Sequence, residues 1–109
     1  MNMMILAAGE GTRLRPYTLQ TPKPAIPFLT VPLASYSLAL LENIKIDTLV
    51  ANTFHLPDQI EKIFKELNYP YRQLIFSSEK EQILGSGGGI HNAEASLIHD
   101  DHFIVMNGD

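Results

Sequence analysis

Four short apolar runs, separated by segments with helical spacing, constrain the fold of this chain more than any other feature of its sequence. The runs are Met3–Ala8, Thr48–Thr53, Tyr71–Ser77 and Phe103–Met106. The first run does not alternate between apolar and polar residues, which is typical of a strand covered on both faces. Strands that alternate with helices pair in parallel through right-handed crossovers. The sequence therefore predicts an α/β fold built on a parallel sheet.

Three helices are predicted between these strands. The first covers Leu33–Ile44, where Leu33, Tyr36, Leu40 and Ile44 lie near helical spacing. The second begins at Pro57, and we expect Asn68 and Pro70 to end it. Its apolar stripe, at positions i, i+3, i+4 and i+7, consists of Ile60, Ile63, Phe64 and Leu67. The third covers Ile90–Ile98 and follows a glycine-rich turn at Gly85–Gly89.

A long loop follows the first predicted strand. Residues 9–32 contain five prolines, which prevent regular structure there. In parallel sheets, ligands lie outside the carboxyl ends of the strands. This rule brings three segments side by side, namely Gly9–Arg15, Ser77–Gly89 and Asn107–Asp109. The unusual residues of the sequence lie in these segments, so we predict a ligand site at this edge.

Composition narrows the function classes. The 109 residues carry a net charge of −4, so the chain has no broad attraction for nucleic acid or for an anionic membrane. It contains no cysteine, which excludes a disulfide scaffold and a thiolate metal site and fits a reducing, cytoplasmic location. No apolar run reaches the roughly 18 residues of a spanning helix, and the amino-terminal segment does not resemble a signal peptide.

The segment Gly9-Glu10-Gly11-Thr12-Arg13 has the composition of an anion-binding turn. Glycines let the backbone approach an anion closely, and Arg13 could add a charge-assisted contact to phosphate. A tight turn with a surface arginine explains the same residues. A dinucleotide-binding fingerprint is excluded because Leu14 stands in place of its third glycine, and no Gly-Lys-Ser/Thr of a P-loop occurs.

A longer pattern resembles a known family. Leu6–Pro16, followed by Thr18 and Pro22–Pro27, resembles the signature of the sugar-1-phosphate nucleotidylyltransferases. Two further segments resemble that family's base-contacting loop and metal-binding motif, namely Leu84–Gly88 and Asn107–Asp109. The resemblance implies a three-layer Rossmann-like parallel sheet with strand order 3-2-1-4. It also implies that residues 1–109 are the nucleotide-binding part of a larger nucleotidyltransferase fold.

The resemblance also implies a reaction and the residues that serve it. A sugar 1-phosphate would attack the α-phosphorus of a nucleoside triphosphate and release pyrophosphate. Arg13 and Lys23 would be catalytic, and Asp109 would hold Mg²⁺. The nucleotide-binding residues implied are Leu6, Ala8, Gly9, Gly11, Thr12, Arg13, Glu79, Gly85 and Ser86. A non-catalytic relative that only binds nucleotide is the alternative. Taken singly, Lys23 and Asp109 would be ordinary surface charges.

Two departures from the family pattern are visible. A threonine, in Thr30-Val31-Pro32, replaces the glycine that normally precedes the first helix. The family's fold also continues past the segment that ends at Asp109, so we expect residues 1–109 to be a fragment that is inactive alone. The fourth strand would then present a bare apolar edge at Phe103–Met106, through which self-association is expected.

The base is predicted from a carboxylate just before the glycine segment. Many thymidylyl and uridylyl members of the family use glutamine there, whereas Glu79, or alternatively Glu81, occupies this region. A carboxylate only accepts hydrogen bonds, and guanine offers two adjacent donors on one edge. This favours GTP and an enzyme like mannose-1-phosphate guanylyltransferase. The similar loop of muramate-1-phosphate uridylyltransferases keeps UTP as the alternative, and a solvated Glu79 with no role is a third interpretation.

Overall fold

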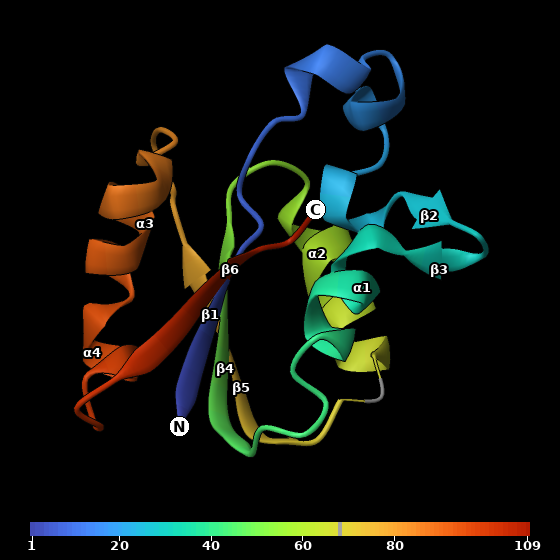
Figure 1. Ribbon diagram of the computed structural model, residues 1–109. Coiled ribbons are helices and arrows are strands. Elements are labelled where there is room, and N and C mark those ends of the chain that lie inside the picture. The colour runs from blue at the N-terminus through green and yellow to red at the C-terminus, as the bar shows by residue number, and fades with distance from the viewer. Residues whose placement is uncertain (68) are drawn as a thin grey trace.

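The computed structural model describes residues 1–67 and 69–109 and contains a central parallel sheet (Figure 1). Its strands are β1 (Asn2–Leu6), β4 (Ile46–Thr53), β5 (Tyr71–Ser78) and β6 (Phe103–Asn107). They lie in the order β5-β4-β1-β6, and every neighbouring pair is parallel. The predicted α/β fold and its strand order 3-2-1-4 are therefore confirmed.

Helices cover both faces of the sheet, which gives three layers (Figure 1). On one face lie α1 (Leu33–Ala39) and α2 (Pro57–Glu66), and on the other lie α3 (Gly85–Asn92) and α4 (Glu94–Leu97). Along β1, Met3 and Ile5 belong to the core under α1 and α2, whereas Met4 packs with Leu97 under α4. All four side chains are fully buried, which explains why the first apolar run does not alternate.

The loop between β1 and α1 is ordered by short turns. It contains η1 (Thr12–Leu14), η2 (Tyr17–Leu19), η3 (Lys23–Ala25) and a small hairpin of β2 (Pro27–Phe28) and β3 (Val31–Pro32). At the tip of the hairpin, Leu29 and Thr30 have φ angles of 50° and 74°, in the left-handed region that favours glycine. The turn thus keeps a glycine-like backbone although threonine has replaced the expected glycine.

The first helix is shorter than predicted and buries a different face. It ends at Ala39 rather than at Ile44, and it buries Ala34, Ser37 and Leu38. Tyr36 and Leu40, which the predicted stripe placed in the core, are 40% and 78% exposed. The small residues face inward because they let α1 approach β6, where Ser37 Oγ donates a hydrogen bond of 2.7 Å to the carbonyl oxygen of Asn107.

The glycine-rich segment is helical rather than a turn. Gly85–Gly89 forms the first turns of α3, and the predicted helix over Ile90–Ile98 is divided at Ala93 between α3 and α4. Glycine is a poor helix former, so packing rather than propensity stabilises this helix. The second helix agrees better with its prediction, since α2 buries Ile60 and Phe64. Asn68, where we expected that helix to end, lies outside the described residues.

β6 is an edge strand within the described part of the chain. It pairs with β1 on one side, and Phe103 at its start is 37% exposed. The predicted apolar edge is therefore present, while self-association through it stays a prediction. Among the described residues, no helix combines the length and the apolar character needed to cross a membrane.

Candidate functional site

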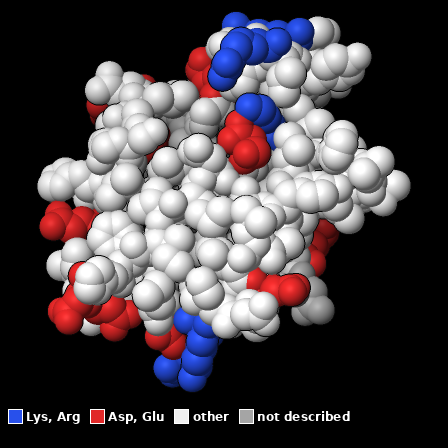
Figure 2. Space-filling model, viewed as in Figure 1, with Lys and Arg blue, Asp and Glu red and all other residues white. Residues whose placement is uncertain are grey.

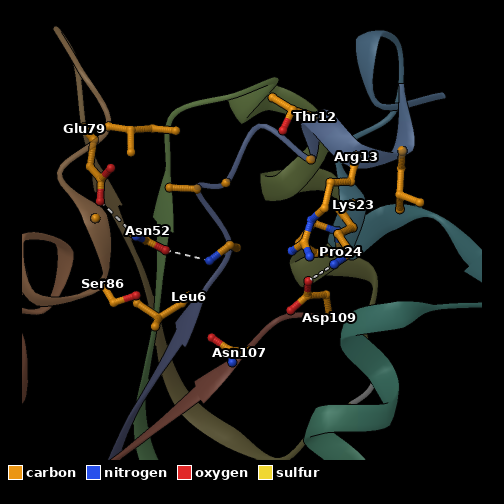
Figure 3. A pocket seen from close by; sticks show the side chains of 17 residues that line it. Leu6, Thr12, Arg13, Lys23, Pro24, Asn52, Glu79, Ser86, Asn107 and Asp109 are labelled. Atoms are coloured by element: carbon orange, nitrogen blue, oxygen red, sulfur yellow. Dashed lines mark hydrogen bonds and ion pairs between the residues drawn. The ribbon is translucent and has the colours of Figure 1, made fainter. Parts of the chain in front are cut away.

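A pocket of about 310 Å³ opens at the carboxyl ends of the sheet strands (Figure 3). Its lining comes from the end of β4, the start of α3 and the residues that follow β1, β5 and β6. All the residues named from the sequence line it, namely Leu6, Ala8, Gly9, Gly11, Thr12, Arg13, Lys23, Glu79, Gly85, Ser86 and Asp109. The predicted convergence of the three segments on one edge of the sheet is confirmed.

The turn of residues 9–13 is locked by contacts within the long loop. Gly11 has a φ angle of +63°, and a Cβ atom there would lie 2.6 Å from Thr18 Cγ2, so only glycine fits. The buried Thr18 donates a hydrogen bond of 2.6 Å from Oγ1 to the carbonyl oxygen of Gly11. Leu14 N donates to the same carbonyl at 3.0 Å. These contacts aim Thr12 and Arg13 at the pocket, whereas Arg15 lies outside its lining and faces Glu10 across 3.9 Å.

A charged cluster of Arg13, Lys23 and Asp109 occupies one side of the pocket (Figure 3). Lys23 starts η3 between two buried prolines, which fixes its backbone, and its ammonium forms an ion pair with the Asp109 carboxylate. Both side chains remain about one-third exposed, at 30% and 34%. Figure 2 shows basic side chains at the top of the molecule, over the loop that follows β1. The middle of this face is uncharged, and further acidic and basic side chains lie along its left and lower margins.

Gly108 determines where Asp109 stands. Its backbone N donates a hydrogen bond of 3.0 Å to the carbonyl oxygen of Leu6. A Cβ atom at this position would lie 3.1 Å from that same oxygen and 3.3 Å from Pro24 Cγ. The glycine therefore lets the chain after β6 pass tightly between β1 and η3, and this passage delivers the Asp109 carboxylate to Lys23.

The opposite side of the pocket is built on Asn52 and Glu79, which we call the amide–carboxylate pair (Figure 3). Both residues are 4% exposed. Asn52 Nδ2 donates a hydrogen bond of 2.9 Å to Glu79 Oε1. Asn52 Oδ1 accepts one of 2.6 Å from Ala7 N, and Glu79 Oε2 accepts one of 3.1 Å from Leu84 N. The interpretation of Glu79 as a solvated loop residue is therefore wrong, because tertiary packing buries it.

Sequence reasoning missed part of this lining. Asn52 is not among the residues named from the sequence, yet it lies at the centre of the pocket's hydrogen bonds. A polar residue at the carboxyl end of a buried strand was the available signal. The lining also includes residues that lie within the predicted segments but were not named individually, namely Ala7, Leu14, Pro24, Ile83 and Asn107. Glu81, the alternative to Glu79, is exposed and lies outside the lining.

The pocket offers few ligands for a metal ion. Within residues 1–67 and 69–109, no group of three or more histidine, cysteine or acidic side chains could hold one. Asp109 contributes one carboxylate beside the two cations of the charged cluster. Because Mg²⁺ commonly takes one or two carboxylates and completes its shell with phosphate oxygens and water, this donor set fits a partial magnesium site.

Comparison with known proteins agrees with this arrangement. The model of the family described as "Nucleotidyl transferase" matches residues 2–109. The UTP–glucose-1-phosphate uridylyltransferase of Synechocystis is 38% identical over 118 residues, which cover 100% of this chain and 30% of that protein. The mannose-1-phosphate guanylyltransferase of Mycobacterium tuberculosis is 34% identical, again over 100% of this chain and 30% of that protein. The chain thus spans about 30% of the length of these relatives.

Solved structures show the same fold. The structure of HddC from Yersinia pseudotuberculosis, complexed with GMP-PN, superposes with a TM-score of 0.75 at 29% identity. The match covers 99% of this chain and 47% of that one. That structure holds GMP-PN, a guanine nucleotide analogue, so a similar protein with this fold binds a nucleotide.

Proposed function

Because the chain belongs to the nucleotidyl transferase family, we propose that its pocket binds a nucleoside triphosphate whose nucleotidyl group is transferred to a sugar 1-phosphate. The observation that carries this proposal is the convergence of three distant segments on one pocket. The turn of residues 9–13, the start of α3 and Asp109 come together there. The relatives named above act on glucose 1-phosphate and mannose 1-phosphate, which supports this substrate class.

The proposed reaction joins two anions. An oxygen of the sugar 1-phosphate attacks the α-phosphorus, and a new oxygen–phosphorus bond forms. The bond from the α-phosphorus to the bridging oxygen of the β-phosphate breaks, and pyrophosphate leaves with that oxygen. The chain's task is to position the reactants and to neutralise charge. The exposed guanidinium of Arg13 is suited to the triphosphate, since a planar fork can hold phosphate oxygens in pairs.

Lys23 supplies a compact charge on the same side of the pocket. Its present partner is the Asp109 carboxylate, so a bound triphosphate would compete for the ammonium. We assign Asp109 as the residue of this chain that holds Mg²⁺. When bound, the cation would polarise the phosphate oxygens and offset their charge. The ion pair between Lys23 and Asp109 keeps both groups at this side of the pocket before substrate binds.

For the base, we propose GTP. Each oxygen of the Glu79 carboxylate accepts one hydrogen bond within the protein. A carboxylate offers about four acceptor positions, so capacity remains for the ring N–H and the amino group of guanine. The guanylyltransferase relatives support this choice, while the uridylyltransferase relative supports UTP as the second candidate.

The proposal is tested by pyrophosphate release from the full-length protein. The assay pairs GTP, UTP, ATP and CTP with mannose 1-phosphate and with glucose 1-phosphate. We expect turnover with at least one pair, and the highest kcat/KM with GTP. Higher kcat/KM with UTP would contradict the GTP assignment alone. Absence of turnover with every pair, from a protein that melts cooperatively, would contradict the transferase and favour a relative that only binds nucleotide.

A further inference from the structure

The hydrogen bonds of the amide–carboxylate pair form one uninterrupted chain. It starts at Ala7 N, passes through the side chains of Asn52 and Glu79, and ends at Leu84 N, with donor–acceptor distances of 2.6, 2.9 and 3.1 Å. Glu79 N also donates to Thr53 O at 2.8 Å, which fixes its backbone to β4. These hydrogen bonds therefore link the residue after β1, the end of β4, the residue after β5 and the N-cap of α3.

Both ends of this chain are backbone N–H groups, which can only donate. The two side chains between them must therefore present three acceptors and one donor to make all three bonds. An amide followed by a carboxylate has this composition. An amide at both positions would leave two donors facing each other, and a carboxylate at both would leave two acceptors facing each other.

The packing of α3 depends on the same pair. A Cβ atom on Gly89 would lie 2.9 Å from Asn52 Nδ2 and 2.9 Å from Glu79 Oε1. Gly89 is buried, and any larger residue there would push α3 away from the pair. The glycine of α3 and the buried pair are thus complementary in shape, and together they set how closely the start of α3 approaches β4.

From these contacts we propose that Asn52 and Glu79 are positioning residues that set the distance between the turn of residues 9–13 and the start of α3. Glu79 is a carboxylate because the hydrogen-bond chain requires two acceptors at this position, whichever base the pocket reads. Ala7 leads into the turn of residues 9–13, and Leu84 leads into Gly85 and Ser86. Loss of the hydrogen bond between the two side chains would therefore displace both the turn of residues 9–13 and the start of α3.

The positioning role of Asn52 and Glu79 is separate from the proposed transferase activity, and it can be tested by measurements that do not depend on turnover. In the full-length protein, Glu79→Gln removes one acceptor and Asn52→Asp removes the only side-chain donor. The double variant Asn52→Asp with Glu79→Gln restores three acceptors and one donor in reversed order. Glu81→Gln is the matched control, because Glu81 is exposed and lies outside the pocket lining.

We expect each single variant to accelerate amide hydrogen exchange in the peptides containing Ala7 and Leu84 and to lower the melting temperature. Asn52→Asp should weaken the binding of GTP and of UTP by the same factor, roughly ten-fold, as expected for a buried donor or acceptor without a partner. Glu79→Gln should weaken both, and GTP more strongly, because it also removes an acceptor proposed for guanine. The double variant should recover exchange protection and the affinity for UTP, and Glu81→Gln should behave as wild type.

Unchanged exchange in Glu79→Gln, or a double variant no better than the worse single one, would overturn the proposal. A changed ratio of GTP to UTP affinity without faster exchange would also overturn it, because Glu79 would then act on the base alone. If the wild-type protein bound neither nucleotide, the proposed function would fail, while the exchange and melting measurements would still decide on the positioning pair.

Discussion

The two sides of the pocket differ in how their polar groups are held. In the charged cluster, Lys23 and Asp109 are 30% and 34% exposed and meet across an ion pair (Figure 3). In the amide–carboxylate pair, both residues are 4% exposed, and every side-chain oxygen has a partner. Exposed ion pairs contribute little to folding, whereas a buried polar group without a partner costs about 1–3 kcal/mol. One side can rearrange around a ligand, and the other side keeps the pocket in shape.

The charged cluster is therefore expected to serve the reaction, and the amide–carboxylate pair to maintain the structure of the pocket. Substitutions in the charged cluster should impair transfer and leave the melting temperature nearly unchanged. Substitutions around the buried pair should lower stability first and affect nucleotide binding through the altered pocket.

The largest effect is expected from Arg13→Ala and Lys23→Ala in the full-length protein. Loss of a group that stabilises developing charge costs about 10²–10³-fold in rate, so each variant should lose most of its kcat in a pyrophosphate-release assay. Because both side chains lie outside the core, the melting temperature should shift little. A variant that retains a near-wild-type rate would remove its residue from the charged cluster's proposed role.

The buried pair is challenged most directly through its neighbour in α3. Gly89→Ala places a methyl group 2.9 Å from both members of the pair and should destabilise the protein by about 1–3 kcal/mol in urea unfolding. Gly87→Ala is the matched control in the same helix, where a Cβ atom meets nothing within 4 Å. That control should stabilise by about 0.4–1 kcal/mol. Equal effects from the two substitutions would contradict the tight fit of α3 against the pair.

The glycines of α3 mark a part of the fold that could not be predicted from the sequence, whereas the strands could. The strands and their order followed from apolar runs such as Met3–Ala8, because burial on both faces leaves a clear mark on composition. The segment Gly85–Gly89 was predicted as a turn, since local propensity disfavours glycine in helices. Its helix depends on contact between Gly89 and the side chains of Asn52, in β4, and Glu79, just after β5, and no local pattern encodes that contact.

Other features were ambiguous for physical reasons. Apolar residues lie on more than one face of the segment that begins at Leu33, so spacing alone selected Tyr36 and Leu40, although Ala34 and Leu38 are the buried residues. The pocket residues of the turn and of the charged cluster were found because they belong to contiguous motifs. Asn52 is a single polar residue at a strand end, and only the structure gives it partners.

A smaller loss is expected on the charged side when the turn of residues 9–13 is loosened. Thr18→Val removes the hydroxyl that donates to the Gly11 carbonyl at 2.6 Å and should cost about 0.5–1.5 kcal/mol of stability in urea unfolding. Nucleotide affinity should fall as well, because Arg13 belongs to this turn. Thr21→Val provides a comparison within the same loop. Unchanged stability and affinity in Thr18→Val would show that the turn is held by other contacts.

The smallest effect is expected from Arg15→Ala. Arg15 is 50% exposed and faces Glu10 at 3.9 Å, and such surface pairs contribute about 0–1 kcal/mol. Its side chain does not line the pocket, so kcat should stay near the wild-type value although Arg13 is only two residues away. A loss comparable to that of Arg13→Ala would show that the charged cluster includes Arg15.

The most direct test of the division between the two sides is a crystal structure of the full-length protein with a non-hydrolysable GTP analogue. We expect the phosphates to lie against Gly11, Arg13 and Lys23. The base should lie beside Glu79, Gly85 and Ser86, with the Asn52–Glu79 hydrogen bond still in place. Phosphates bound at the Glu79 side, or a nucleotide bound outside this pocket, would contradict this expectation.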